Sequence, residues 1–206
     1  MNHDLSNNPL RQRLRAARAA LTPQQQAAAA ARLAARVINS GFFRSCRRIA
    51  CYLPNNGEID PTALIERLWK MNRQCYLPVL SPLANGRLWF APVTADTLLA
   101  PNRFNIPEPV VPAHTWRRAR ELDLILMPLV GFDLHGNRLG MGGGFYDRTL
   151  EFLRYRRHWH TPRLVGLAHE CQRVATLSPS PWDIPLQTVV TDSAIYQFKP
   201  FHRACP

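Results

Sequence analysis

Apolar residues recur at helical spacing close to the start of the chain. Leu10, Leu14, Ala17 and Leu21 fall on one face of a helix, which predicts that this face packs against the rest of the protein. The remaining faces carry Arg11, Arg13, Arg15 and Arg18. We therefore expect an amphipathic helix whose arginines point toward solvent.

A second helix is predicted to begin at Pro23. Thr22 and Gln25 match a capping box, in which each side chain accepts a hydrogen bond from a backbone N–H group at the helix start. Proline is favoured at the first helical position because its missing N–H would have had no partner there. The helix is expected to run to about Ile38 and to end near residues 40–41.

Further along, short apolar runs bounded by turn residues predict strands. These runs are Arg48 to Leu53, Gln74 to Leu80, Leu88 to Ala91, Leu122 to Met127, Arg163 to Ala168, Thr188 to Thr191 and Ala194 to Phe198. The run from Leu122 to Met127 is apolar enough to lie at the centre of a sheet. Two helices are predicted between strands, one from Asp60 through Leu68 and one from about Phe145 to Tyr155.

Strands and helices alternate along the chain, as they do in proteins whose parallel sheet is covered by helices. We expect an α/β fold, a three-layer sandwich with a largely parallel, Rossmann-like sheet, formed by a single domain over residues 1–206. Residues 1–8 and 199–206 are expected to be flexible ends. The proline-rich residues 94–120 are expected to form a long irregular surface segment.

The composition is that of a globular protein, with 46% apolar residues, and it is strongly basic, with a formal net charge of +12. All but two of the 26 basic residues are arginines. This charge indicates an anionic ligand, because a positive field concentrates phosphates and carboxylates. The anionic ligand could be a nucleic acid, which the Arg156–His160 cluster also suggests. Alternatively, the arginine content reflects a GC-rich coding sequence and no ligand at all.

Cysteine usage and the N-terminus bear on location. Five cysteines, with no CxxC pair, are expected to be reduced and mostly buried thiols, as in a cytoplasmic protein. They show no zinc-ligand spacing. The polar and basic residues 1–18 contain no apolar run of signal-peptide or membrane-spanning length, so we expect neither export nor a membrane partner.

The most informative segment is a glycine-rich loop after the central strand. Ligands of such sheets bind at the carboxyl ends of strands, which here lead into residues 54–60 and 131–147. Glycines in the second loop allow positive φ, and successive N–H groups in such turns bind anions. Arg138 can clamp phosphate oxygens, and Asp147 can hold a magnesium ion that bridges phosphates.

Common phosphate-binding motifs do not match this loop. A P-loop would need GxxxxGK[ST], and Phe145 stands where GxGxxG requires its last glycine. A tight connection in which Asp147 stabilises a helix start remains the alternative.

The loop from Arg138 to Arg148 resembles the signature of the 5-formyltetrahydrofolate cyclo-ligase family, whose members are also called methenyltetrahydrofolate synthetases. The resemblance extends in order over about residues 8–197. Its other parts are Leu10-Arg11 with Arg18 to Thr22, Gly57 to Asp60, Asn105 to Pro109, Leu122 to Pro128 and Trp182 to Pro185. It implies a ligase that uses ATP and Mg²⁺ to convert 5-formyltetrahydrofolate into 5,10-methenyltetrahydrofolate.

The resemblance also implies a role for each matching residue. ATP-binding residues would be Arg11, Arg138, Leu139, Gly140, Met141, Gly142, Gly143, Gly144, Phe145 and Tyr146. Substrate-binding residues would be Leu53, Glu58, Met141, Gly142, Gly143, Gly144 and Phe145. Arg138 and Asp147 would be catalytic, and Asp147 and Asp183 would hold the metal. Phe145 replaces a tyrosine of some relatives, which removes any contact by its hydroxyl.

Taken from the residues alone, several of these positions have plainer interpretations. Glu58 is a loop acid, Asp183 a turn residue, Leu53 a core residue and Arg11 a solvated arginine, while Asp60 is a helix cap rather than a ligand.

One position departs from the family pattern. Many relatives have a lysine or arginine where this chain has Asn7, so a cationic ATP contact is missing or comes from Arg13 or Arg15. We expect a monomer that binds a folate, with or without a polyglutamate tail, and no nucleic acid. The rivals are a basic nucleic-acid-binding module and an α/β enzyme such as a sugar-phosphate isomerase, which would need no Mg-ATP.

Overall fold

The structure is a computed structural model that describes residues 7–81, 86–155 and 161–198. Its helices are α2 (Asn8–Ala19), α3 (Pro23–Asn39), α4 (Thr62–Lys70) and α5 (Phe145–Leu150). Short 3₁₀ helices are η1 (Ala113–Thr115), η2 (Ala119–Glu121), η3 (Glu151–Tyr155) and η4 (Glu170–Gln172). The Arg156–His160 cluster and the predicted ends, apart from residues 7 and 8, lie outside the described residues.

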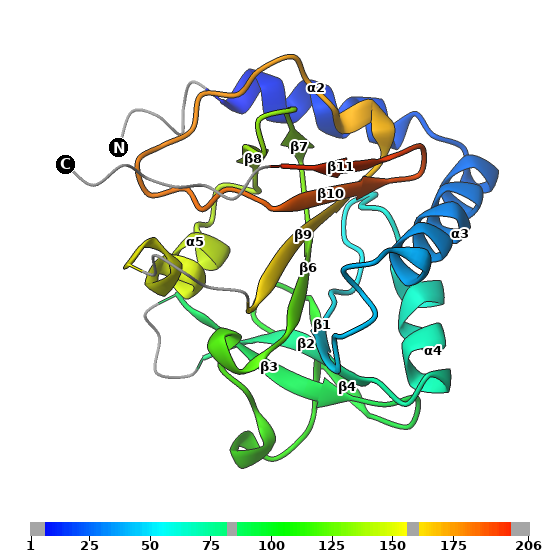
Figure 1. The fold of residues 1–206 in the computed structure, drawn as a ribbon, viewed down its shortest axis with the longest axis vertical. Helices are drawn as coiled ribbons and strands as arrows, with labels where there is room; N and C mark the ends of the chain where they lie inside the picture. Colours follow the sequence, from blue (N-terminus) through cyan, green and yellow to red (C-terminus); the bar gives the residue numbers. More distant parts are fainter. Residues whose placement is uncertain (1–6, 82–85, 156–160, 199–206) are drawn as a thin grey trace.

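A seven-stranded sheet with the order β11-β10-β9-β6-β1-β2-β3 forms the centre of the molecule (Figure 1). Its strands are β1 (Arg48–Ala50), β2 (Gln74–Leu80), β3 (Leu88–Val93), β6 (Leu124–Pro128), β9 (Arg163–Ala168), β10 (Thr188–Thr191) and β11 (Ile195–Gln197). The strands from β10 to β2 run parallel, and the edge strands β11 and β3 are antiparallel to their neighbours. The apolar β6 is the middle strand, as predicted.

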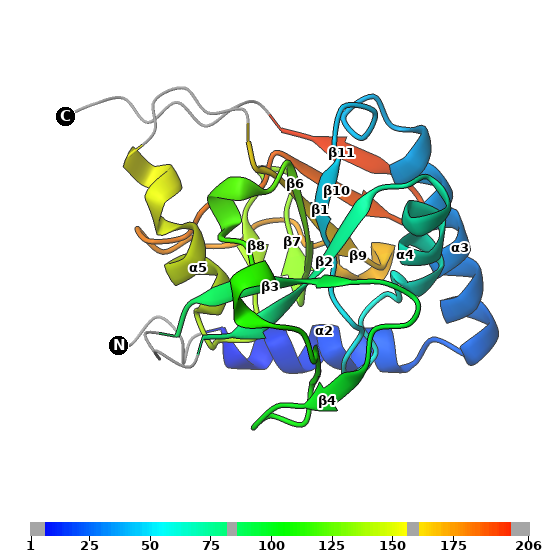
Figure 2. The ribbon, with the colours of Figure 1, turned by 90° about the horizontal axis from the view of Figure 1, so that it is seen from below.

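Helices cover both faces of this sheet. Figure 2 shows α3 and α4 on one side and α5 on the other. One buried apolar cluster joins α3 and α4 to the sheet, and a second cluster packs on the opposite face beneath α5 and η3. The expected α/β sandwich with a largely parallel sheet is therefore confirmed.

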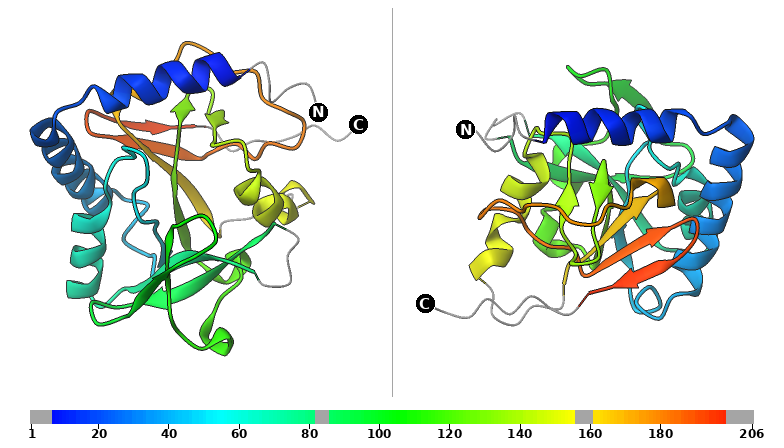
Figure 3. Two further views of the ribbon diagram at one scale, coloured as in Figure 1. Left: turned by 180° about the vertical axis from the view of Figure 1, so that it is seen from behind. Right: turned by 90° about the horizontal axis from the view of Figure 1, so that it is seen from above.

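Helix α2 lies outside these layers and crosses the end of the sheet where β6 finishes (Figure 3). Leu14 packs there with Val130 and Leu139, which follow β6 in the chain. The buried face of α2 is formed by Arg11, Leu14 and Arg18. The prediction that leucines form this face and arginines the others was therefore wrong for Arg11 and Arg18.

Local capping signals are confirmed. Thr22 Oγ1 accepts a hydrogen bond from the N–H of Gln25, whose side chain accepts one from the N–H of Thr22 (3.2 and 2.8 Å). Asp60 Oδ1 accepts from the N–H of Thr62 at 2.8 Å, although the N-cap of α4 is Pro61 and the helix begins two residues later than predicted. Polar side chains thus occupy donors that the first turn of each helix leaves without an intrahelical partner.

Several predicted segments differ in detail, and the strand expected from Arg48 to Leu53 ends at Ala50. The helix expected from Phe145 to Tyr155 is α-helical only to Leu150 and continues as η3. The irregular segment 94–120 contains a two-stranded ribbon of β4 (Leu99–Pro101) and β5 (Pro107–Pro109) as well as η1 and η2. A further ribbon, β7 (Gly131–Phe132) with β8 (Arg138–Leu139), leads into the glycine loop. In the described part of the chain, no helix is long and apolar enough to cross a membrane.

Candidate active site at the carboxyl ends of the parallel strands

A cavity of about 680 Å³ lies beyond the carboxyl ends of β1 and β6. Every residue assigned to a site from the sequence lines it. These residues are Arg11, Leu53, Glu58, Arg138, Leu139, Gly140, Met141, Gly142, Gly143, Gly144, Phe145, Tyr146, Asp147 and Asp183. Segments far apart in the chain therefore meet in one space large enough for a nucleotide or folate-sized ligand.

The glycine loop forms one wall of this cavity. Gly142 and Gly144 adopt positive φ (97° and 63°), which other residues reach only with strain. Residues 140–143 are exposed, whereas α5 begins directly after Gly144. Because α5 is only six residues long, an anion at this wall would be bound by loop amides rather than by a long helix dipole.

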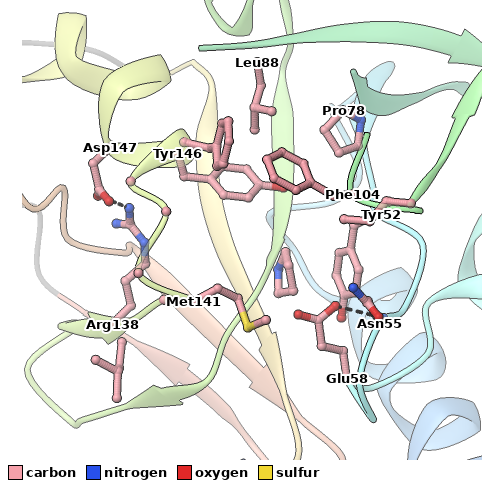
Figure 4. A pocket seen from close by; sticks show the side chains of 18 of the residues that line it. Tyr52, Asn55, Glu58, Pro78, Leu88, Phe104, Arg138, Met141, Tyr146 and Asp147 are labelled. Atoms are coloured by element: carbon pink, nitrogen blue, oxygen red, sulfur yellow. Dashed lines mark hydrogen bonds and ion pairs between the residues drawn. The ribbon is translucent and has the colours of Figure 1, made fainter. Parts of the chain in front are cut away.

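An ion pair stands at one end of the cavity. The Arg138 guanidinium donates to Asp147 Oδ1 and to the carbonyl oxygen of Ile184. The Arg138 side chain is 7% exposed, so both contacts fix a nearly buried cation whose partner Asp147 is 25% exposed. This pair points into the space that Figure 4 shows, with Asp147 on α5 and Arg138 on β8.

Asp183 lies close to this pair. Its Oδ2 accepts a hydrogen bond from the N–H of Ser180 at 2.8 Å, so the turn role considered from the sequence is present. Burial raises the pKa of Asp183, and the negative charge of Asp147 raises it further. The side chain thus both holds a turn and brings a second carboxylate to the same end of the cavity.

This pair of carboxylates fits a magnesium ion that arrives with a nucleotide. In the described part of the chain, no three His, Cys, Asp or Glu side chains form a ready metal site. Mg²⁺ is commonly bound by one or two carboxylates together with substrate phosphates and water. The mutual repulsion of Asp147 and Asp183 is what a divalent cation would relieve.

Glu58 lies at the other end of the cavity (Figure 4). Its Oε2 accepts a hydrogen bond from the N–H of Asn55 at 3.1 Å, and its own N–H donates to the Asn55 carbonyl at 3.1 Å. Burial raises the pKa of Glu58 to about 7, opposed by the Asn55 N–H group and then by the charges of Arg18 and Arg15. The acid is therefore fixed, desolvated and aimed at the space where a ligand would lie.

Between the two ends the lining is flat and apolar. Figure 4 shows Tyr146, Phe104 and Met141 between Glu58 and the ion pair, with Leu88 and Pro78 above them. Phe104 meets Phe145 edge to face, with ring centroids 6.0 Å apart. Such walls suit a planar ring system.

The N-terminal helix contacts the glycine loop directly. Arg11 Nε donates to the carbonyl oxygen of Gly140 at 3.0 Å, and Arg15 Nη2 contacts Met141 Sδ at 3.4 Å. Arg13 is exposed, while Asn7 lines the cavity. Of the two arginines considered as replacements for a cation at position 7, Arg15 is the one beside the loop.

A profile of the 5-formyltetrahydrofolate cyclo-ligase family matches residues 4–192. The chain belongs to this family. This membership favours a cyclo-ligase over the two alternatives left by the sequence, a nucleic-acid-binding module and a sugar-phosphate isomerase.

Named relatives agree with this assignment. The chain is 40% identical over 185 residues to the 5-formyltetrahydrofolate cyclo-ligase of Escherichia coli K12, covering 90% of this chain and all of the relative. It is 41% identical over 179 residues to that of Haemophilus influenzae, covering 86% and 92%. The protein is thus an enzyme of the cyclo-ligase type.

Solved structures of the family share the fold. The NMR structure of Aquifex aeolicus 5,10-methenyltetrahydrofolate synthetase superimposes with a TM-score of 0.79 at 26% identity, covering 97% of this chain and 96% of that one. A synthetase from Mycoplasma pneumoniae has the same fold, with a TM-score of 0.67 at 22% identity, over 93% and 99% of the two chains.

Some cavity residues of this cyclo-ligase family member were missed from the sequence. Tyr52 follows β1, and its hydroxyl donates to the carbonyl oxygen of Ile59 at 2.7 Å, which ties the Glu58 loop to the strand end. Phe104 comes from the segment that was expected to be irregular surface. Tyr52 adjoins the assigned Leu53, which was an available signal, whereas no sequence pattern places Phe104 in the cavity.

Proposed function

We propose that the protein catalyses the ATP-dependent cyclisation of 5-formyltetrahydrofolate to 5,10-methenyltetrahydrofolate, with release of ADP and phosphate. The observation that carries this proposal is the polarity of one cavity, which has the acid Glu58 at one end and a cation with two carboxylates at the other. The N–H groups of a pterin require an acidic partner and a triphosphate requires a cationic one. Residues of both kinds line the same cavity.

At the acidic end, Glu58 would bind the pterin. An ionised carboxylate accepts two parallel hydrogen bonds, which matches the amino group and ring N–H of a pterin. The planar ring would lie against the aromatic and apolar wall that includes Tyr146 and Leu53. This arrangement would place the formyl group toward the glycine loop.

At the cationic end, the loop amides, Arg138 and Arg11 would bind the triphosphate of ATP. Asp147 and Asp183 would hold Mg²⁺, and the bound ion would neutralise negative charge on the phosphates. Arg138 is already fixed by Asp147 and Ile184, so its charge needs little reorganisation during the reaction. The protein would thus act by positioning and electrostatic stabilisation.

The proposed chemistry has two steps. The formyl oxygen on N5 attacks the γ-phosphorus of ATP, the bond to ADP breaks, and an N5-iminium phosphate forms. N10 then attacks the formyl carbon, the carbon–oxygen bond breaks with departure of phosphate, and the N10 proton is released. No covalent bond to the enzyme is needed, so the cavity has only to hold both substrates in line and exclude water.

The direct test is incubation with 5-formyltetrahydrofolate and Mg-ATP while the absorbance of methenyltetrahydrofolate is followed. We expect product and ADP to appear in equal amounts, with none when ATP is replaced by a non-hydrolysable analogue. Product formed without ATP, or no product at all, would refute the proposal.

Folate binding is expected to depend on pH through Glu58. Its pKa of about 7 means that the carboxyl is largely protonated at pH 6, and the protonated form accepts fewer hydrogen bonds from the pterin. The Kd for 5-formyltetrahydrofolate should therefore tighten about tenfold between pH 6 and pH 8. Calorimetric titration at several pH values measures this, and a flat profile contradicts the assignment.

Ionisation of Glu58 is expected to strengthen folate binding but to lower the stability of the folded protein. Because the folded pKa of Glu58 lies above its unfolded value, its ionisation opposes folding, and its contribution to stability is lost as pH rises from 4.5 through about 7. Glu58→Gln should therefore remove the pH dependence of folate binding and reduce that of stability.

The N-terminal helix is expected to contribute to ATP affinity. Arg11→Ala should raise the KM for ATP clearly, because it removes a cation held against the glycine loop. Asn7→Lys should lower that KM a few-fold, since an added charge pair at a partly exposed site is worth at most about 1 kcal/mol. The gain should shrink as salt is added.

Steady-state kinetics over a range of ATP concentrations checks both changes. Arg13→Ala is the matched control, because Arg13 is exposed and does not line the cavity. A silent Arg11→Ala together with a damaging Arg13→Ala would overturn the proposed role of α2.

A cytoplasmic location, a monomeric state and binding of a polyglutamate tail stay predictions.

A further inference from the structure

Arg18, in the last turn of α2, is a buried cation. Its side chain is 0% exposed, and its Nη1 makes a long hydrogen bond of 3.5 Å to the carbonyl oxygen of Leu129. Its Nε and Nη2 have no hydrogen-bond partner within the described structure. A buried guanidinium is costly unless a negative charge lies near it, so its surroundings should contain such a charge.

The side chain of Arg18 packs against the turn that carries Glu58. Gly57 has a φ of 75°, and a Cβ atom placed on it would lie 3.8 Å from both Cγ and Nε of Arg18. The turn is closed on its other side by the paired hydrogen bonds between Asn55 and Glu58. Arg18 therefore supports the backbone directly before the acid that lines the cavity, without lining the cavity itself.

The charges around Glu58 come from several elements. Helix α2 presents Arg18 and Arg15, the end of β1 presents Tyr52, α5 presents Tyr146, and Asp60 follows in the same loop. Arg18 and Glu58 make no direct ion pair in the described structure. Burial lowers the pKa of Arg18, and the charge of Glu58 is the strongest effect opposing that change. Each group is thus a main source of compensating charge for the other.

We propose that Arg18 is a positioning residue for substrate binding: it supports the Asn55–Glu58 turn and keeps the Glu58 carboxylate charged, so that it can accept both N–H groups of a pterin. This inference rests on the proposed role of Glu58 in binding folate. Arg18 would act through Glu58 alone and would leave ATP binding unaffected.

The first test measures Glu58 in the ligand-free protein. Side-chain carboxyl carbons of ¹³C-labelled glutamate are followed by NMR as pH changes, and Glu58→Gln identifies the signal. In Arg18→Met, which removes the charge, the midpoint should rise by roughly one pH unit, while Arg18→Lys should stay near the parent. Arg13→Met, on the exposed face of the same helix, is the matched control and should cause no shift.

The second test measures the Kd for 5-formyltetrahydrofolate in the same variants. Arg18→Met should weaken binding about fivefold at pH 7 and approach the parent value at pH 9, because the acid is then ionised in both proteins. The Kd for ATP should not change. A loss of folate affinity that is equal at every pH, or an unchanged Glu58 midpoint, would overturn the proposal in favour of simple packing.

A third measurement covers the case in which Arg18→Met does not fold. At pH 8.5, adding Glu58→Gln to Arg18→Met should restore a folded protein, because it removes the buried carboxylate whose charge Arg18 no longer compensates. A Glu58→Gln/Arg18→Met double variant that also fails to fold contradicts the proposed coupling. Absence of folate binding in the parent would reject the proposed function, yet the ligand-free titration would still report on Arg18 and Glu58.

Discussion

Replacing Asp147 by Ala is expected to abolish turnover while the fold is retained. Asp147 is the partner that fixes Arg138 and is one of two carboxylates suited to hold Mg²⁺. Its loss would remove a proposed ligand of Mg²⁺ and would free the Arg138 guanidinium at the same time. Charge stabilisation at phosphoryl transfer is worth several kcal/mol, so kcat should fall about a thousandfold or more.

The measurement is kcat at saturating ATP, folate and Mg²⁺, with circular dichroism as the check on folding. Asp183→Ala should lose less activity, because one oxygen of Asp183 is already engaged by the N–H of Ser180, whereas Asp147 is the carboxylate that fixes Arg138. Asp96→Ala is the matched control, since Asp96 is exposed and does not line the cavity. Turnover within about threefold of the parent in Asp147→Ala would exclude Asp147 from the phosphate site.

Replacing Glu58 by Gln is expected to weaken folate binding and to leave ATP binding nearly unchanged. The substitution keeps the shape of the side chain but turns one acceptor into a donor, which leaves one pterin N–H group unpaired in a closed site. Such a loss costs about 1–3 kcal/mol, or roughly 5- to 150-fold in Kd. The effect should be largest at pH 8, where Glu58 of the parent is ionised.

Separate titrations with 5-formyltetrahydrofolate and with ATP measure this change. Glu66→Gln, on the exposed face of α4, is the matched control and should alter neither affinity. Unchanged folate affinity combined with weaker ATP binding would mean that the loop from residue 54 to residue 60 serves the nucleotide instead.

The predictions for Asp147 and Glu58 can be tested independently, because the two residues lie at opposite ends of the cavity. Glu58 belongs to the loop after β1, whereas Asp147 lies on α5 after the glycine loop. Figure 4 shows aromatic side chains between them, so neither substitution removes a contact of the other end. A variant that damaged both affinities equally would indicate a change of fold rather than of binding.

The sequence by itself determined the elements whose signals are local. The capping box at Thr22 and Gln25 needs only neighbouring residues and formed as predicted, and Asp60 accepts a hydrogen bond at the start of α4, although Pro61 is the N-cap. The apolar run before residue 128 became the central strand because it is apolar on both faces. Glycines at 142 and 144 took positive φ because that conformation is readily available to them.

Only the tertiary structure decided which side chains meet. Spacing along α2 favoured a leucine face, yet Arg11 and Arg18 are buried, because the loops that this helix covers present carbonyl oxygens to them. Phe104 enters the cavity through the β4–β5 ribbon, a pairing that depends on contacts with β2 and β3. Periodicity shows which face of a helix is apolar, but it does not show which groups of the protein that helix packs against.

The chemistry of the site shows the same division. The sequence placed an acid after β1 and an arginine and an acid around the glycine loop, since these belong to continuous motifs. The rise in the pKa of Glu58 comes from burial, and the contact of Arg138 with Ile184 joins residues 46 positions apart. Desolvation and contacts between distant segments exist only once the sheet has assembled, and for that reason the polarity of the cavity was decided by the tertiary structure.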